Sequence, residues 1–306
     1  MSGFSVEIEN VSKSFGKVEA LKGITLEVEK SALFGVIGPD GAGKTTLFRI
    51  LTSLLKPASG KASLQGYDVV KDYKAIRRIV GYMPGRFSLY FDLTVEENLK
   101  FYATIFGTTI EENYHLVKDI YSQIEPFKDR KAGNLSGGMK QKLALSCAMI
   151  HKPEVLILDE PTTGVDAVSR KEFWDMLKML KEQGITILVS TPYMDEASLC
   201  DRVALMQKGK ILDNDTPKNI IQKFRYPLYK TITDNMYELP VDLTDLEKTV
   251  SARRFGDSVH LAVSEETEKG IIEDFLLKKG HKIVEVEKID PGIEDCFMDL
   301  MTQTDE

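Results

Sequence analysis

Residues 32–50 read ALFGVIGPDGAGKTTLFRI, and this stretch decides the fold. Its first part, 33–37, is a continuous apolar run of the kind that forms a strand buried on both faces of a parallel sheet. The apolar spacing of its last part predicts a helix over 44–54. The glycine-rich segment between them matches the pattern G-x-x-x-x-G-K-[ST]. Its defining positions are Gly38, Gly43, Lys44 and Thr45.

This strand–loop–helix unit predicts a site for the phosphates of a nucleotide. Glycines let consecutive backbone N–H groups curl around a phosphate, and the N-terminus of the following helix adds its dipole. Lys44 is expected to reach the β- and γ-phosphates, and Thr45 to give its hydroxyl to Mg²⁺. The alternative is a glycine-rich turn without a ligand, but the position between a strand and a helix argues against it. The predicted nucleotide contacts in the loop are Gly38, Pro39, Asp40, Gly41, Ala42, Gly43, Lys44, Thr45 and Thr46.

A second motif, VLILDEP at 155–161, ends another apolar strand. Asp159 closes this strand, so its carboxylate is expected at the C-terminal edge of the sheet, where ligands bind in open α/β folds. At that edge it could hold Mg²⁺ through water. The side chain of Glu160, the next residue, is expected to point in another direction than that of Asp159. It could polarise an attacking water. A solvated strand end is the alternative, and the phosphate loop upstream makes it the weaker one.

Residues 1–225 alternate short β-type runs with helical periods, which predicts an α/β domain with a mainly parallel central sheet. Two early strands alternate polar and apolar residues, which indicates a peripheral antiparallel sheet. The expected strands are 5–9, 24–29, 33–37, 62–66, 154–158, 186–190, 202–207 and 210–213. The expected helices are 44–54, 94–106, 112–124, 137–151, 167–183, 193–199 and 217–225.

After about residue 225 the pattern changes. Residues 226–245 show no helical period and contain two prolines. A strand-like HLAVS, a helix at 265–279, a strand KIVEVEKI and a short last helix from Pro291 follow. We therefore expect residues 226–306 to form a small α+β extension.

Composition restricts the functional classes. Asp plus Glu number 47 and Lys plus Arg 40, and the resulting net charge of −7 argues against broad nucleic-acid binding. No signal-peptide core is expected at the N-terminus, and no apolar run approaches the length that spans a bilayer. Any role at a membrane is therefore expected to pass through a partner. The cysteines and histidines follow no metal-ligand spacing, so we expect buried reduced thiols and no metal cluster.

LSGGMKQK at 135–142, placed before a predicted helix, carries a family resemblance. Together with the phosphate loop and LDEP, it closely resembles the ATPase subunit of ATP-binding cassette (ABC) transporters, over residues 5 to about 222. The resemblance implies a P-loop ATPase fold with a peripheral antiparallel β-subdomain and an α-helical signature subdomain. It also implies that Phe15 stacks on adenine and that Asp166, in GVDAVSR, is the acidic residue of the D-loop.

The resemblance further implies a head-to-tail dimer, in which each ATP, with Mg²⁺, lies between one subunit's phosphate loop and the other's signature segment. A serine hydroxyl and glycine amides at a helix N-terminus form an anion site, so they can serve a phosphate loop in trans. Hydrolysis would separate the halves and drive an integral-membrane permease from the cytoplasmic face. The implied trans contacts are Leu135, Ser136, Gly137, Gly138 and Gln141, with Glu160 and Lys44 catalytic and Thr45 and Asp159 on Mg²⁺.

Several segments resemble the exporter subtype, in which the ATPase pairs with a small six-helix permease for drug resistance or polysaccharide export. These segments are DLTVEENL, PTTGVDAVSR, STPYMDEA and the tail DPGIEDCFMDLM. Phe87, Tyr90 and Phe91 are expected in a loop. They could meet the permease or pack within the fold, and the sequence leaves both open.

Two positions depart from the family pattern. Gly85 stands where the family has a glutamine that binds Mg²⁺ and the attacking water, and Pro192 stands where it has a histidine that contacts the γ-phosphate. Proline offers neither a side-chain donor nor an N–H. Loss of one such group costs about 10²–10⁴ in rate, so nucleotide binding is expected to survive while turnover falls.

These departures leave three hypotheses open. In the first, an active homodimer uses Thr191, Tyr193 or Arg86 in place of the missing groups. In the second, this chain is the impaired member of a heterodimer and lends its signature segment to a complete partner site. In the third, it is a nucleotide-gated assembly module with little turnover, and the retained Glu160 argues against that.

Overall fold

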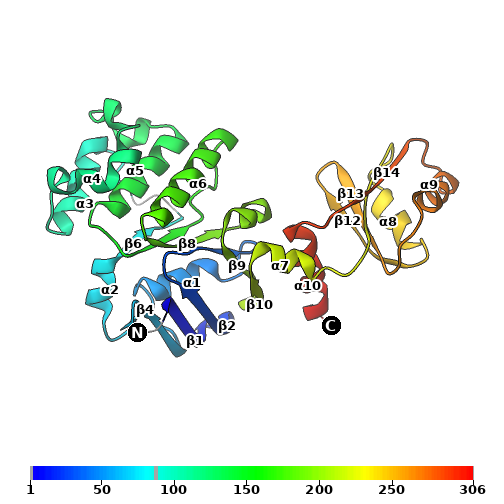
Figure 1. The fold of residues 1–306 in the computed structure, drawn as a ribbon, viewed down its shortest axis with the longest axis horizontal. Coiled ribbons are helices and arrows are strands. Elements are labelled where there is room, and N and C mark those ends of the chain that lie inside the picture. Colours follow the sequence, from blue (N-terminus) through cyan, green and yellow to red (C-terminus); the bar gives the residue numbers. More distant parts are fainter. Residues whose placement is uncertain (1–2, 86–88, 306) are drawn as a thin grey trace. The chain divides into compact units, whose positions relative to one another are not determined.

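Two compact units make up the protein, Met1–Lys218 and Asn219–Glu306. The structure is a computed structural model that describes residues 3–85 and 89–305 (Figure 1). The sequence places the boundary after residue 225, whereas the structure divides within helix α7 (Pro217–Gln222). Each unit has a hydrophobic core of its own.

The centre of the first unit is a six-stranded sheet. In spatial order its strands are β10 (Lys210–Asp215), β9 (Arg202–Gln207), β3 (Leu33–Ile37), β8 (Thr186–Thr191), β7 (Val155–Asp159) and β6 (Val80–Met83). All neighbouring strands are parallel except β9 and β10, which form an antiparallel hairpin at one edge. Every residue of β3, β7 and β8 is buried, which fits the apolar runs at 33–37, 155–158 and 187–189. The predicted mainly parallel sheet is confirmed.

A four-stranded antiparallel sheet flanks the central one. Its order is β2 (Val18–Glu29), β1 (Phe4–Phe15), β4 (Ser59–Leu64) and β5 (Tyr67–Asp68). The alternating pattern predicted this sheet, but β1 and β2 run further than expected, because their pairing continues through register shifts to Phe15 and Val18. That extension brings Phe15 to the cleft beside the phosphate loop.

Helices cover the rest of the first unit. In the described residues they are α1 (Lys44–Leu51), α2 (Tyr73–Ile79), α3 (Val95–Ile105), α4 (Ile110–Tyr121), α5 (Gly137–Met149) and α6 (Ala167–Glu182). Helices α3, α4 and α5 pack together as a helical subdomain (Figure 1). Helix α2 was not predicted, because Ile76 is its one buried residue and leaves no periodicity to detect. The helix expected at 193–199 is instead a short 3₁₀ segment, η3 (Met194–Leu199), which fits the brief connection from β8 to β9.

Two of these helices begin with a capping box. Thr94 Oγ1 accepts the Glu97 N–H at 3.1 Å, while Glu97 Oε2 accepts the Thr94 N–H at 2.8 Å. Thr109 and Glu112 repeat this exchange at the start of α4, at 3.2 and 3.1 Å. Each box satisfies two backbone donors that the helix leaves open, so it fixes where the helix starts.

The second unit is an antiparallel sheet with two crossover helices. Its strand order is β12 (Thr249–Phe255), β13 (Ser258–Val263), β11 (Leu228–Thr233) and β14 (Val284–Ile289). Helix α8 (Leu239–Thr244) links β11 to β12, and α9 (Lys269–Lys278) links β13 to β14, a split βαβ arrangement. The α+β class is confirmed. β11 was missed because polar Thr231 and Thr233 stand on its buried face, and α8 because its six residues include Pro240 and are too few for a helical period.

Helix α10 (Ile293–Asp305) closes the second unit. His260 Nδ1, on β13, lies 2.7 Å from Asp295 Oδ1 and fastens this helix to the sheet. Asp295 Oδ2 also accepts the Gly292 N–H at 2.8 Å. One buried carboxylate therefore fixes both the start of α10 and its attachment to β13.

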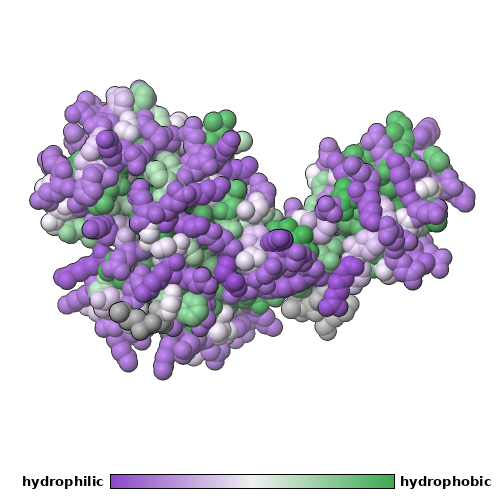
Figure 2. Space-filling view, viewed as in Figure 1, coloured by the Kyte–Doolittle hydropathy of each residue, from purple (hydrophilic) through white to green (hydrophobic). Residues whose placement is uncertain are grey.

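Within the described residues, no helix is both long and apolar enough to cross a membrane. Figure 2 shows hydrophilic side chains spread over the visible face of each unit, with hydrophobic ones in small groups between them.

Candidate functional site

The loop between β3 and α1 is shaped by its glycines. Gly41 and Gly43 have φ of +79° and +109°, a left-handed backbone that only glycine adopts at little cost. At Gly38 a Cβ atom would lie 2.1 Å from the Met206 carbonyl oxygen, so any side chain there would collide with β9. The loop therefore needs these glycines, and its N–H groups lead into the N-terminus of α1 as the sequence predicts.

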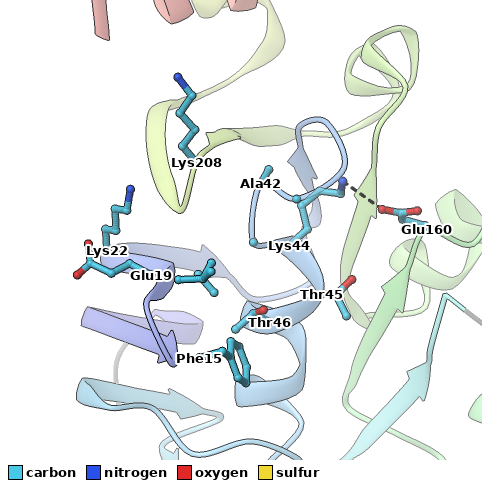
Figure 3. A pocket seen from close by; sticks show the side chains of 13 residues that line it. Phe15, Glu19, Lys22, Ala42, Lys44, Thr45, Thr46, Glu160 and Lys208 are labelled. Atoms are coloured by element: carbon cyan, nitrogen blue, oxygen red, sulfur yellow. Dashed lines mark ion pairs between the residues drawn. The ribbon is translucent and has the colours of Figure 1, made fainter. Parts of the chain in front are cut away.

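Lys44 lies inside this loop and is only 4% exposed. Its Nζ donates to the Gly38 and Pro39 carbonyls at 2.7 and 3.1 Å, and lies 3.1 Å from Glu160 Oε1 (Figure 3). The structure thus brings together the lysine of the first motif and the glutamate of the second. A cation held between backbone carbonyls and one carboxylate suits a site that receives a polyanion.

A cleft of about 450 Å³ opens over the loop and Glu160. Phe15 stands at the rim of this cleft and is 51% exposed. The cleft is lined by Phe15, Val18, Glu19, Ala20, Lys22, Gly41, Ala42, Gly43, Lys44, Thr45, Thr46, Glu160 and Lys208. Sequence reasoning missed the residues from β2 and from the β9–β10 turn, because they belong to no motif and reach the cleft only through folding.

The carboxylate of Asp159 is held in place at the end of β7. It is 2% exposed, and its Oδ1 accepts the Ser190 hydroxyl at 2.7 Å. The next residue, Glu160, has a left-handed φ of 50°, and its N–H donates to Ser190 Oγ at 2.9 Å. Ser190 orients both acidic residues, and no motif in the sequence marked it.

The Asp159 carboxylate also affects a neighbouring tyrosine. Burial, with the nearby Asp159 charge, raises the pKa of Tyr82 to about 12.

The donors present fit a Mg²⁺ ion bound with a nucleotide. Asp159 and Thr45 offer hard oxygen atoms, and in nucleotide sites Mg²⁺ takes one or two protein oxygens together with phosphates and water. A set of three or more His, Cys, Asp or Glu side chains able to hold a metal alone is absent from residues 3–85 and 89–305. The cysteines Cys147, Cys200 and Cys296 are buried, as predicted, and burial raises the pKa of the Cys147 thiol.

The two altered positions lie at the edge of this site. A Cβ at Gly85 would lie 3.1 Å from the Asp159 carbonyl oxygen and 3.9 Å from its carboxylate carbon. Pro192 follows Thr191, whose carbonyl accepts the Gly38 N–H at 3.2 Å. Neither residue brings a side-chain donor or acceptor to the site. Two residues that the sequence raised, Arg86 as a substitute and Phe87 as a contact aromatic, lie outside the described residues.

The signature segment lies apart from the cleft, whose lining includes none of its residues. Ser136 caps α5 by accepting the Met139 N–H at 3.4 Å, and both Ser136 and Gly137 are exposed. Gly138 and Leu135 are buried, and Gln141 is buried while donating to the Pro161 carbonyl. The N-terminus of α5 is therefore exposed, and its N–H groups could bind an anion. The cleft lined by the phosphate loop of the same chain does not extend to it.

Asp166 begins α6 next to this segment. Its Oδ1 accepts the N–H groups of Ser169 and Val168 at 3.0 and 3.1 Å, and the bond from Ser169 is the main cause that holds the pKa of this carboxyl below its usual range. Ser169 also packs on Gly138, where a Cβ would lie 2.5 Å from the Ser169 hydroxyl oxygen. The D-loop and the signature segment thus form one continuous surface.

Comparison with known proteins identifies this arrangement. The ABC transporter family model matches residues 21–163. Nod factor export ATP-binding protein I of Burkholderia lata is 38% identical over 220 residues, which cover 71% of this chain and 72% of that protein. The chain belongs to the ABC transporter family. Its first unit is an ABC ATPase cassette.

Other ABC proteins extend the comparison. The probable multidrug ABC transporter ATP-binding protein YbhF of Escherichia coli is 37% identical over 307 residues, covering 98% of this chain and 53% of that protein. This chain therefore spans about half the length of that relative. The ABC cassette MJ0796, solved as a post-hydrolysis dimer bound to ADP and Pi, is 25% identical, with a TM-score of 0.62 over 69% of this chain and 98% of that one.

Proposed function

We propose that this chain is the ATP-binding and ATP-hydrolysing subunit of an ABC exporter, which dimerises on ATP and powers a separate membrane permease. The observation that carries the proposal is the pairing of Lys44 with Glu160 at 3.1 Å, in a cleft that Phe15 borders. The names of the relatives, Nod factor export and multidrug transport, support an exporter.

The chain's own residues would divide the work as follows. The loop amides and Lys44 would bind the phosphates, and Phe15 would stack on adenine. Thr45 and Asp159 would hold Mg²⁺, which neutralises charge on the transferred phosphate. Glu160, exposed enough at 23% to meet solvent, would polarise the attacking water.

The exposed end of α5 supports a dimer as the working unit. Ser136 and Gly137 would contact the ATP of a second ATPase subunit, since no part of their own cleft lies beside them. The remaining partner is an integral-membrane permease, which would hold the chain at the cytoplasmic face of the cell membrane. The ABC dimer with ADP and Pi named above supports this assembly by analogy.

Gly85 and Pro192 support a slow reaction rather than none. Both lack the polar group that the family uses at those positions, and Thr191, a candidate substitute, already donates its hydroxyl to Glu196 at 2.5 Å. The alternative is an impaired member of a heterodimer, or a gated assembly module with little turnover. The retained Glu160 favours hydrolysis, because a site that only binds ATP has no use for it.

Steady-state ATP hydrolysis by the purified chain tests the proposal, with Glu160→Gln as the matched variant. We expect measurable turnover that falls by about 10²-fold or more in the variant, with ATP affinity retained, because a positioned base contributes about 10²–10⁴. Sedimentation should show an ATP-dependent dimer that the Glu160→Gln variant stabilises. A wild-type rate equal to that of Glu160→Gln would count against hydrolysis and favour the heterodimer or the gated module.

A further inference from the structure

A buried carboxylate joins the two sides of the nucleotide site. Glu196, in η3, is 2% exposed, and its Oε2 accepts the hydroxyls of Thr162 at 3.1 Å and Thr191 at 2.5 Å. Thr162 lies in the turn that carries Glu160. Thr191 ends β8, and its carbonyl accepts the N–H of Gly38 in the phosphate loop at 3.2 Å. One side chain thus ties the catalytic turn to the strand that supports the phosphate loop.

The second oxygen of this carboxylate lacks a hydrogen bond. Glu196 Oε1 is buried and has no donor among the described residues. Among the residues that the structure describes, the nearest cation is Arg170, whose Nε lies 4.0 Å from that oxygen, beyond hydrogen-bond distance. The same guanidinium lies 3.9 Å from Asp195 Oδ2 and 5.3 Å from the centre of the Tyr193 ring. Burial of a carboxylate oxygen without a donor is unfavourable, so a small movement of Arg170 onto Oε1 would be favoured.

Arg170 stands where such a movement can follow dimer formation. It lies on α6, one turn after Asp166, and its N–H donates to the Asp166 carbonyl at 2.9 Å. Gly164 lies just before this turn, and a Cβ at Gly137 of the signature segment would lie 3.8 Å from the Gly164 carbonyl oxygen. The signature segment therefore adjoins the segment that leads into Arg170. A second subunit's nucleotide bound at the signature segment would act on that neighbouring segment.

We propose that Glu196 is a positioning residue for hydrolysis, and that Arg170 completes its site when a second subunit engages the signature segment and the D-loop. The inference rests on the proposed ATPase function. In this chain Pro192 cannot donate to a γ-phosphate. Instead, the hydrogen bonds from Thr162 and Thr191 to Glu196 hold Glu160 at a fixed position relative to the phosphate loop.

Steady-state kinetics of Glu196→Gln and Arg170→Met test this proposal. The glutamine keeps the volume and an acceptor for the threonines but removes the charge that faces Arg170. We expect kcat to fall by about 10²-fold in each variant, the scale of a roughly 1 Å misplacement, with KM and Mg·ATP affinity within about twofold of wild type. Lys181→Met is the matched control, because it lies on the same helix, is 33% exposed against 30% for Arg170, and loses an ion pair of 2.7 Å. It should keep the wild-type kcat.

The double variant separates positioning from general destabilisation. Because both groups act through one junction, Glu196→Gln with Arg170→Met should lose no more rate than the worse single variant. Thermal midpoints identify a folding defect, and Arg170, being partly exposed, can be replaced even where Glu196 cannot. An unchanged kcat in Arg170→Met, additive losses, or equal losses of kcat and ATP affinity would overturn the proposal. A wild-type chain without Glu160-dependent turnover would instead defeat the proposed function, and this inference with it.

Discussion

At the scale of single residues, Gly85 and Pro192 are the reason why we expect slow turnover. Pro192 sits directly after Thr191, whose carbonyl accepts the N–H of Gly38 in the phosphate loop at 3.2 Å, so Pro192 lies next to a residue that contacts the loop. Gly85 lies beside Asp159, since a Cβ at Gly85 would lie 3.1 Å from the Asp159 carbonyl oxygen. Neither residue brings a side-chain donor or acceptor to the site, and both leave its backbone in place. We therefore expect ATP binding to be retained while hydrolysis is slow.

Restoring one of these groups should raise the rate. We expect Pro192→His to increase kcat by about 10-fold or more with little change in ATP affinity, since a single charge-stabilising donor is worth about 10²–10³ when fully positioned. Gly85→Gln is a stricter case, because its Cβ would lie 3.1 Å from the Asp159 carbonyl and some adjustment is needed. ATPase assays of both variants, each paired with Glu160→Gln, check this. A rate below wild type in Pro192→His would show that another residue already occupies the role.

At the scale of elements, the helical subdomain is attached to the central sheet through a partly buried histidine. His151 follows α5 and its Nε2 lies 3.1 Å from the Val80 carbonyl at the start of β6. Its ring stacks on Phe106 at the end of α3, with centroids 3.7 Å apart. Nδ1 is buried and has no hydrogen-bond partner among the described residues. The histidine joins three elements and is held there in its neutral form.

This histidine should make the first unit acid-sensitive. Burial lowers the pKa of His151 from 6.5 to about 4, so the unfolded chain takes up this proton first as pH falls. The free energy of unfolding therefore keeps the full contribution of this group above pH 6.5. It falls by about 3 kcal/mol in all between pH 6.5 and 4. Urea unfolding of wild type and His151→Phe between pH 7 and 5 measures it, and the phenyl ring keeps the stack on Phe106. Equal pH slopes in the two proteins would refute this assignment.

At the scale of the whole molecule, the chain divides into a complete cassette and a separate α+β unit. Every residue that lines the nucleotide cleft lies between Phe15 and Lys208, within the first unit. The second unit has its own core, which includes Tyr229, Leu261 and Ile272. The second unit therefore contributes no described residue to the lining of this cleft.

Truncation tests this independence. A chain ending after residue 225 keeps all of α7, with its buried Ile220, and should bind Mg·ATP with the full-length affinity. The separate fragment 226–306 should fold alone, because its sheet and both crossover helices lie within it. Titration calorimetry and circular dichroism check the two fragments. A large loss of ATP affinity on truncation would show that the extension supports the site, and weaker ATP-dependent dimerisation would mark it as a brace.

The sequence by itself determined the class of fold, the order of the motifs and the chemistry of the phosphate loop. These features are local: a buried strand reads as an apolar run, and a left-handed loop around a phosphate needs glycine at Gly41 and Gly43. The departures at Gly85 and Pro192 follow from the resemblance to the ABC family, since it is the family pattern that assigns a glutamine and a histidine to those positions. The expected helices at 94–106 and 137–151 fell close to α3 and α5, since each has several turns of clear periodicity.

Only the tertiary structure decided which distant side chains share the site. Ser190 on Asp159, Lys208 at the cleft and Glu196 between Thr162 and Thr191 belong to different elements, and no local pattern links them. The topology of the second unit was also decided there, because β11 buries polar Thr231 and Thr233 and the six residues of α8 are too few for a helical period. Hydrogen bonds between residues far apart in the chain depend on how strands are ordered in a sheet, and that order is a property of the packed core rather than of any one segment.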